Sequence, residues 1–372
     1  MIYLDYTAHM PPDEAALRAF GNAERTYIGN PNSHHSAGYE AGNAMAGYAR
    51  QAAEALQVSP EEIIFTSGAS ESNNTAIQGI AYASRHFGRH MITTPLEHPS
   101  VSGCLTALQE RGWQIDVLSI DRQGRIDLEE LKELLRPDTV LLTLCAVDSE
   151  LGVIQPVREA SDILKAYPHC RLHVDATQAV GKIPFDFSLA DTVSLSGHKF
   201  GGVSGSGILY KKQAVDMEPL IHGGVSTTLY RSGTPAVGLA ASLVTALCTA
   251  LEKQGERYER VRALNALLRT EFSRRGMRVH SPENAVPYIL NGGINGIKAA
   301  AFRDAMNRHG VCISVKSACS VEHTPSRAVY AVTKNRKQAL ESWRVSLSHL
   351  TTNEEINEFL RILDAVCKEI QA

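Results

Sequence analysis

The chain has 372 residues, of which 44% are hydrophobic and 21% are charged, a composition typical of a globular protein with more than one domain. Its formal charge of −3 gives no broad attraction for nucleic acid or an acidic membrane, so neither is expected as a partner. The N-terminus has no signal-peptide pattern, no apolar run reaches the roughly 20 residues of a membrane helix, and the seven scattered cysteines suit neither disulfides nor zinc, so a cytoplasmic location is expected.

Short β-rich runs alternate with amphipathic helical stretches between about residues 60 and 210. Several of these runs are almost wholly apolar, as expected for strands that are buried on both faces. One intervening helix is predicted to begin at Asp127, with Glu130 at its third position. The alternation predicts a largely parallel α/β sheet. The predicted strands span residues 63–67, 90–94, 115–120, 139–147, 171–176, 192–196 and 207–210.

The C-terminal third has a different pattern. A long helical stretch is predicted over about residues 236–275, and shorter strand-like pieces follow it. A last helix is predicted to begin at the capping box of residues 352–355 and to bury one apolar face. We therefore expect a large domain over residues 12–250 and a small domain formed by residues 1–11 and 251–372.

Polar residues follow the carboxyl ends of several predicted strands, where parallel sheets place their binding sites. The turn after the first strand, residues 67–74, opens a helix whose free N–H groups and dipole favour an anion. His98 follows the second strand, Asp175 ends the fifth and Lys199 follows the sixth. Each has an ordinary structural explanation when taken alone. Together they match the requirements of pyridoxal phosphate (PLP), namely an amine, a carboxylate, a stacking ring and a phosphate site.

Several segments strengthen this interpretation: FTSGASESNN, EHPSV, LGVIQPV, HVDATQAVGK, SLSGHKFGG, RSGT, SACS and WRVSL. With them the chain resembles the cysteine desulfurases, which belong to the class V aminotransferase group of fold-type I PLP enzymes. The similarity keeps the same order from Tyr3 to Arg344 and beyond. It implies an α/β fold-type I PLP-dependent transferase, with a mainly parallel central sheet flanked by helices and a smaller α+β C-terminal domain.

The resemblance implies how PLP would be held. Lys199 would bond the cofactor covalently and later move protons at the substrate Cα, while Asp175 would pair with the pyridinium. Gln178 would donate to the phenolic oxygen, and His98 would stack on the ring and also serve as an acid or base. Thr234 would reach the phosphate of a neighbouring subunit, which implies a homodimer with shared sites. The phosphate ligands within one subunit would be Ala69, Ser70, Ser196 and His198.

The resemblance also implies the reaction, the conversion of L-cysteine to L-alanine with Cys319 as the sulfur acceptor. Arg344 would bind the substrate carboxylate through a bidentate pair, and Ser149 lies in a motif that contacts cofactor and substrate. Lys316 would lower the pKa of the Cys319 thiol. The persulfide sulfur would serve iron–sulfur clusters or tRNA thiolation, through a sulfur-acceptor or scaffold protein. No metal ligand is expected among these residues.

Three segments differ from the family pattern. Asp148-Ser149-Glu150 replaces Asn-Asn-Glu, His9-Met10 replaces Thr-Thr at the substrate side, and the residues around Cys319 lack the usual glycine, which stiffens that loop. Alternative functions therefore stay open at this point. They are an aminotransferase or lyase of the same fold that does not use Cys319, including a selenocysteine lyase, and a non-catalytic paralogue.

Overall fold

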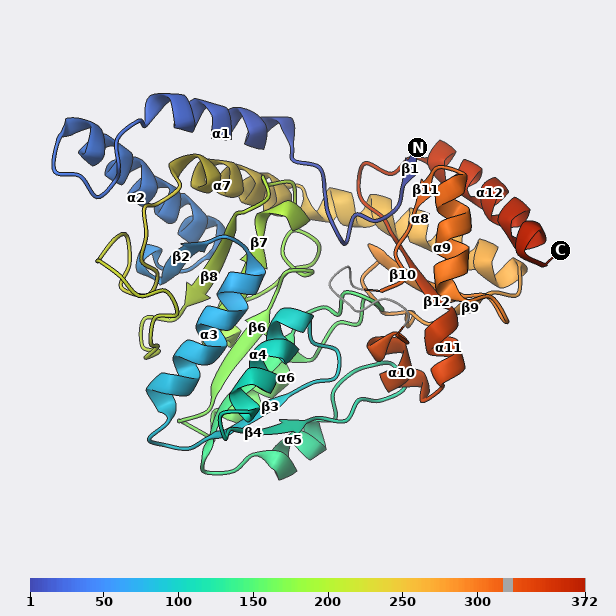
Figure 1. The fold of residues 1–372 in the computed structure, drawn as a ribbon, viewed down its shortest axis with the longest axis horizontal. Helices are drawn as coiled ribbons and strands as arrows, with labels where there is room; N and C mark the ends of the chain where they lie inside the picture. Colours follow the sequence, from blue (N-terminus) through green and yellow to red (C-terminus); the bar gives the residue numbers. More distant parts are fainter. Residues whose placement is uncertain (317–323, 372) are drawn as a thin grey trace.

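The computed structural model describes residues 1–316 and 324–371, and a seven-stranded sheet lies at its centre (Figure 1). The strand order is β2-β8-β7-β6-β5-β3-β4; β8 runs antiparallel to both β2 and β7, and the other neighbouring pairs are parallel. The predicted α/β fold with a mainly parallel central sheet is confirmed. The strands are β2 (Ile63–Thr66), β3 (His90–Thr93), β4 (Gln114–Val117), β5 (Thr139–Cys145), β6 (Arg171–Asp175), β7 (Thr192–Ser196) and β8 (Gly207–Lys211).

All seven predicted strands are present, and their boundaries differ most at the edge. Strand β4 ends at Val117 instead of residue 120. The chain leaves the sheet there because the Ser119 N–H donates to the Glu130 carboxylate at 2.5 Å. Ile120 then pairs with Ile126 in an isolated bridge. An edge strand has only one neighbour to extend it, so a local partner of this kind ends it early.

Helices cover both faces of the sheet, and they are α3 (Ala69–Ser84), α4 (Pro99–Gln109), α5 (Leu128–Leu134) and α6 (Val157–Leu164). The alternation of side chains along a strand separates the two faces. In β5, Leu141 packs with Ile77 of α3 and Leu105 of α4. Its neighbour Leu142 belongs to the main core with residues of α5 and α6. Strand β5 is therefore buried on both sides, as its apolar run predicts.

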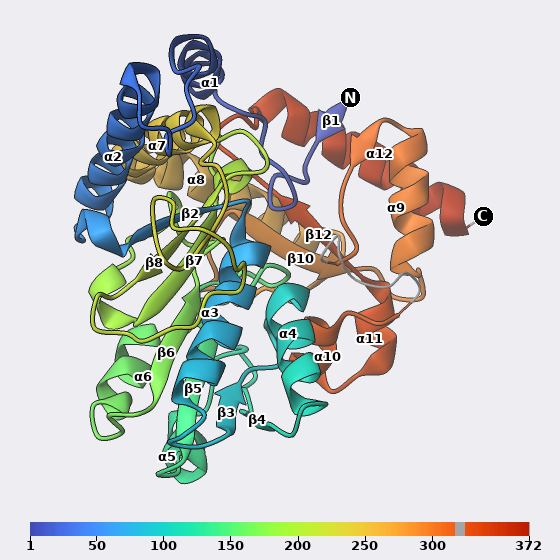
Figure 2. The same ribbon diagram turned by 60° about the vertical axis from the view of Figure 1, so that its left-hand side comes forward.

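The predicted helical stretch over residues 236–275 is present and consists of two helices. The chain breaks at Lys253, whose φ of −93° and ψ of 8° lie outside the helical region. The first of the two helices packs beside the N-terminal helices, and the second leads into the C-terminal part (Figure 2). The helices of this region are α1 (Glu14–Thr26), α2 (Ser36–Leu56), α7 (Val237–Glu252) and α8 (Gln254–Arg274), and short 3-10 turns are η1 (Pro60–Glu62), η2 (Phe187–Leu189) and η3 (Gly197–Lys199).

Two small sheets form the C-terminal part. Strand β10 pairs antiparallel with both β9 and β12, and the N-terminal strand β1 pairs in parallel with β11. The first residues therefore join the C-terminal part, which supports the predicted domain division, although the boundary itself stays a prediction. The strands are β1 (Ile2–Tyr3), β9 (Arg278–Val279), β10 (Ile289–Gly293), β11 (Val311–Cys312) and β12 (Ser342–Ser346).

Four helices complete this part, namely α9 (Ala299–Arg308), α10 (Arg327–Thr333), α11 (Arg336–Glu341) and α12 (Asn353–Gln371). The predicted capping box is confirmed, because the Thr352 N–H donates to the Glu355 side chain and the Glu355 N–H donates to the Thr352 hydroxyl. Its helix α12 buries Phe359 and Leu363 fully. None of the helices within residues 1–316 and 324–371 is both long and apolar enough to cross a membrane.

Candidate active site

A cavity of about 370 Å³ lies at the carboxyl ends of β5, β6 and β7, between the central sheet and the C-terminal part. Residues from at least five separate segments reach it, which is the arrangement expected at this edge of an α/β sheet. The structure therefore brings together most of the side chains predicted from the sequence. The predicted site residues that line the cavity are Ala69, Ser70, His98, Ser149, Asp175, Gln178, Ser196, His198, Lys199 and Arg344.

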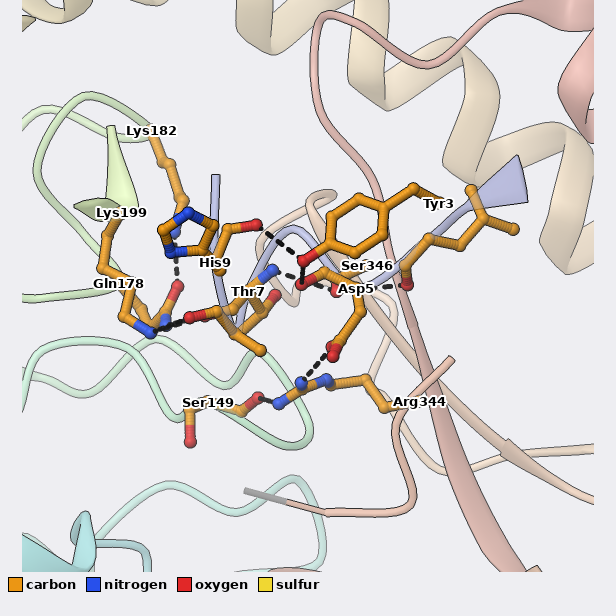
Figure 3. A network of polar contacts seen from close by, with 12 residues as sticks. Tyr3, Asp5, Thr7, His9, Ser149, Gln178, Lys182, Lys199, Arg344 and Ser346 are labelled. Carbon is orange, nitrogen blue, oxygen red and sulfur yellow. Dashed lines mark hydrogen bonds and ion pairs between the residues drawn. The ribbon is translucent and has the colours of Figure 1, made fainter. Parts of the chain in front are cut away.

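Lys199 points its amine at the N-terminal segment of the chain (Figure 3). Its Nζ atom donates to the carbonyl oxygens of Thr7 at 2.9 Å and Ala8 at 2.6 Å. The residue ends η3, directly after β7, and the turn exposes its side chain to the cavity. The amine is thus held by neutral acceptors beside the cavity.

Gln178 lies next to this amine and is fixed by a second lysine (Figure 3). Lys182 donates to Gln178 Oε1, and Gln178 Nε2 donates to the Thr7 carbonyl at 3.1 Å. A carbonyl oxygen can only accept, so the bond to Thr7 fixes the orientation of the amide, with Nε2 as the donor and Oε1 toward Lys182. Burial, together with the nearby charges of Lys199 and Arg344, lowers the pKa of Lys182 to about 7. Sequence reasoning missed Lys182, although it lies within the HVDATQAVGK segment.

The start of α3 forms an anion cradle on the cavity wall. Gly68 precedes the helix with a φ of 147°, and no side chain among the described residues caps its first N–H groups. A Cβ on Gly207 would lie 2.6 Å from the Gly68 Cα atom, so the close approach of the two segments requires glycine. The first-turn N–H groups of Ala69 and Ser70 are therefore available to an anion.

His198 and Ser196 lie opposite this cradle. The Ser196 hydroxyl and His198 Nδ1 are 3.0 Å apart. Burial is the main reason that the pKa of His198 falls to about 4, and the charge of Lys199 adds to the effect. The ring of His9, a residue that differs from the family pattern, stacks on His198 with centroids 5.7 Å apart. His9 also lines the cavity, as its predicted place at the substrate side requires.

Arg344, in the middle of β12, is 2% exposed at its side chain yet reaches the cavity (Figure 3). Its guanidinium donates to the Ser149 carbonyl at 2.7 Å and to Asp5 Oδ1 at 2.8 Å. Nε is buried and has no hydrogen-bond partner within residues 1–316 and 324–371. Ser149 therefore helps to hold Arg344 through its main chain, a role that the sequence did not reveal.

One predicted residue within the described part of the chain, Thr234, does not line the cavity. Cys319 lies outside the described residues. Lys316 and Thr324, the described residues on either side of it, are joined by a hydrogen bond of 2.6 Å and line a neighbouring cavity of about 300 Å³. His98 borders both cavities. Thr234 is exposed and does not contribute to either of these two cavities, and its role toward a neighbouring subunit stays a prediction.

The whole length of the chain matches one family of known proteins. The model of the family described as aminotransferase class-V matches residues 2–359. The chain belongs to the class-V aminotransferase family. A NifS/IcsS protein homolog of Lactobacillus delbrueckii subsp. bulgaricus is 35% identical, with 98% of this chain and 97% of the relative covered. A cysteine desulfurase IscS of Escherichia coli O139:H28 is also 35% identical and covers 97% of this chain and 91% of its own length.

A solved structure described as a NifS-like protein has the same fold, with a TM-score of 0.93, 32% identity and 99% of both chains covered. Another, described as SspA in complex with cysteine, has a TM-score of 0.81 and 28% identity, with 95% of this chain and 100% of that chain covered. The resemblance to the cysteine desulfurases of the class V group is confirmed by these similarities.

Members of this family depend on PLP in general, and the residues at the cavity fit that cofactor. The N-terminus of α3 offers uncapped N–H groups for a phosphate. Asp175, a buried carboxylate at the end of β6, suits a pyridinium nitrogen. Lys199 supplies an amine on the same cavity wall.

Cys145 lines the cavity with its thiol, at the end of β5. Its Sγ atom lies 3.7 Å from the Leu96 carbonyl, to which it donates. Burial first, and the neighbouring Glu97 second, raise the pKa of this thiol well above its ordinary value. Because the thiolate is the reactive form, Cys145 is unsuited to nucleophilic attack.

Glu97 is a fully buried carboxyl group behind the cavity. Its Oε1 atom accepts from the Cys145 N–H at 2.7 Å and the Thr94 hydroxyl at 3.0 Å. Its Oε2 atom has no hydrogen-bond partner among the described residues. Burial, with the charge of Asp175 adding to it, raises the pKa of Glu97 from 4.5 to about 8. The side chain is therefore neutral at pH 7.

This shift predicts a pH dependence of stability. Because the pKa of Glu97 is higher in the folded state, its contribution is complete below about pH 4.5 and is lost as pH rises through about 8. We expect the free energy of unfolding of the wild type, minus that of Glu97→Gln, to fall by about 2 kcal/mol between about pH 6 and 9. Urea unfolding at several pH values measures this difference. Glu129→Gln, at an exposed position, is the control, and a constant difference for Glu97→Gln would contradict the prediction.

Proposed function

We propose that the protein is a PLP-dependent cysteine desulfurase that converts L-cysteine to L-alanine and passes the sulfur to Cys319 as a persulfide. The observation that carries this proposal is the meeting of Lys199, Asp175 and Arg344 at one cavity. These three side chains come from η3, β6 and β12, which are far apart in the sequence. The full-length similarity to curated cysteine desulfurases supports the same function.

Each cavity residue has a chemical role in this proposal. PLP, when bound, supplies an electron sink for bonds at the substrate Cα. The negative charge of Asp175 favours a protonated pyridine nitrogen. Lys199 holds the cofactor and moves the proton at the substrate Cα, and His98 covers the ring. Gln178 directs its Nε2 donor at the phenolic oxygen because Lys182 occupies Oε1. Ala69, Ser70, Ser196 and His198 would hold the phosphate.

Arg344 provides the site for the substrate carboxylate. Its guanidinium is held by Ser149 and Asp5, so the planar group is already oriented before the substrate binds. A bidentate pair with a carboxylate needs this planar geometry, which lysine lacks. The unpartnered Nε is a further donor that a carboxylate can satisfy.

Replacing Arg344 by lysine tests this role. We expect the KM for L-cysteine to rise about tenfold to a hundredfold in Arg344→Lys, because one directional pair of hydrogen bonds is lost. The PLP absorbance is expected to stay unchanged. Steady-state alanine formation measures KM and kcat separately. A lower kcat with an unchanged KM would contradict a role in binding the substrate carboxylate.

The sulfur step balances without an external oxidant or reductant. The Cys319 thiolate attacks the substrate sulfur, an S–S bond forms, and the carbon–sulfur bond breaks. The substrate carbon receives a proton and leaves as L-alanine, while the enzyme keeps a persulfide. Lys316 and Thr324 border the cavity that His98 shares with the active site. Cys319 follows Lys316 by three residues, a span of at most about 10 Å.

A second copy of the chain is part of the proposal. Thr234 is exposed and lies in a segment with two exposed apolar side chains, Val225 at 76% and Leu229 at 70%. In a homodimer this segment would be covered, and Thr234 would bind the phosphate in the partner. The persulfide would supply iron–sulfur cluster assembly or tRNA thiolation in the cytoplasm, through an acceptor or scaffold protein.

Alanine formation tests the function directly. Protein loaded with PLP is incubated with L-cysteine and a reductant, and alanine and sulfide are measured together. Equal yields of the two products are expected from a desulfurase. Transfer of the amino group to a 2-oxo acid, without sulfide, would favour an aminotransferase. Selenocysteine as sole substrate would favour a selenocysteine lyase, and bound PLP without any turnover would favour a non-catalytic paralogue.

A further inference from the structure

A chain of buried polar side chains lies behind the cavity and joins Asp175 to His98. At its centre is Asn73 of α3, which is fully buried. Asn73 Nδ2 donates to Asp175 Oδ2 at 2.8 Å and to the Ser100 hydroxyl oxygen at 2.9 Å. Asn73 Oδ1 lies 2.9 Å from His173 Nε2. The residues come from α3, α4 and β6, so only the tertiary fold brings them together.

The donor and acceptor of each hydrogen bond in this chain of side chains follow from one main-chain group, the Ser100 N–H. The Ser100 N–H donates to His98 Nδ1 at 3.1 Å. Because a main-chain N–H cannot accept, His98 Nδ1 carries no proton and the neutral ring holds it on Nε2. The Ser100 hydroxyl, 2.8 Å from the same Nδ1 atom, must then be a donor to it. Its oxygen is left to accept from Asn73.

The hydrogen-bond directions at the other end of this chain of side chains, around Asn73 and His173, are fixed in the same way. Both Nδ2 hydrogens of Asn73 are used, so Oδ1 accepts from His173 Nε2–H. His173 Nδ1 accepts from the Thr192 hydroxyl at 2.9 Å. Burial lowers the pKa of His173 to about 4, so the ring is neutral. Asp175 is held at its second oxygen by the Thr177 N–H at 3.0 Å.

We propose that Asn73 is a positioning residue that couples Asp175 to His98. It holds the carboxylate that serves the pyridine nitrogen of PLP, and through Ser100 it keeps His98 as the Nε2–H tautomer. His98 can take a second proton at Nδ1 only by giving up the bond from the Ser100 N–H and reversing the direction of its bond with the Ser100 hydroxyl. The ring therefore serves the reaction as a donor from Nε2. This inference rests on the proposed function.

The first test compares two neighbouring asparagines of α3. Asn73→Ala removes the coupling, whereas Asn74→Ala removes bonds to the Ser70 and Ser100 carbonyl oxygens and the bond from the Gln78 side-chain amide. We expect Asn73→Ala to raise the dissociation constant of PLP about tenfold to a hundredfold, because a hydrogen bond to a buried carboxylate is lost. Asn74→Ala is expected to change it by less than about threefold. PLP binding is followed by absorbance, and equal values for the two variants would overturn the inference.

Ser100→Ala provides a second test at a less buried position. It removes the hydroxyl that donates to His98 Nδ1 and keeps the main-chain bond. The neutral ring loses a stabilising donor, so the acidic limb of the kcat profile is expected to move up by about 0.5 to 1 pH unit. The charged groups that face His98, namely Asp175, Lys199 and Arg327, are unchanged in this variant.

A double-mutant cycle separates coupling from simple destabilisation. The shifts of the acidic limb in Asn73→Ala and Ser100→Ala are expected to be non-additive, because both break the same chain. The shifts in Asn74→Ala and Ser100→Ala are expected to add. If the acidic limb of the pH profile of kcat does not move in Ser100→Ala, the inference is overturned, even if Asn73→Ala does not fold. A wild type that neither binds PLP nor forms alanine would overturn the proposed function, and the coupling with it.

Discussion

Replacing Lys199 by alanine is expected to lower alanine formation by at least about 1,000-fold. The proposal gives this one amine two roles, which are to hold the cofactor and to move the proton at the substrate Cα. Its Nζ atom donates to the main-chain oxygens of Thr7 and Ala8, and the side chain is only partly buried and borders the cavity. The fold should therefore survive. Alanine formation is measured on wild type and variant, and thermal unfolding checks their stability.

The nearby Lys182 is the alternative carrier of the cofactor. It is buried, its pKa is lowered to about 7, and it lies close enough to Gln178 to bond its side chain. Borohydride reduction of PLP-loaded protein, followed by peptide mass spectrometry, distinguishes the two lysines. We expect the cofactor mass on the Lys199 peptide. A label on Lys182, or alanine formation that survives in Lys199→Ala, would contradict the assignment.

Replacing Cys319 by alanine is expected to lower alanine formation by at least about a hundredfold while the PLP absorbance stays unchanged. The cofactor ligands line the main cavity, whereas the described neighbours of Cys319 line the adjacent one. Loss of the thiol should therefore remove the sulfur acceptor and leave cofactor binding intact. Alanine and enzyme-bound persulfide are measured after incubation with L-cysteine.

Two other cysteines provide the comparison for this experiment. Cys312 of β11 is partly buried and serves as the matched control, so Cys312→Ala is expected to keep its activity. Cys145 lines the cavity but has a strongly raised pKa. Activity that survives in Cys319→Ala and disappears in Cys145→Ala would move the acceptor role to Cys145. Equal activity in wild type and Cys319→Ala would favour a reaction that needs no enzyme thiol.

Most of the central sheet could be predicted from the sequence because its signals are local. The run Thr139–Cys145 is apolar on both faces, and β5 is buried on both faces as a result. The polar residues Asp175 and Lys199 follow such runs directly, so their place at the edge of the sheet follows from strand direction alone. The helical stretch over residues 236–275 was also predicted, but the break at Lys253 was not, since it has no strong local signal such as proline.

The partners of these residues were decided by the tertiary structure. In the sequence, Asn73 is an ordinary polar residue within a predicted helix. In the structure it forms a hydrogen bond with His173, at a sequence separation of 100 residues. Arg344 and Asp5 are separated by 339 residues. The local sequence around a polar side chain is the same whether the side chain is exposed or buried in a network. Only packing decides whether water or another side chain is its hydrogen-bond partner. The sequence by itself therefore determined the fold class and many of the residues that line the cavity, whereas the tertiary structure determined how they are held and where their protons lie.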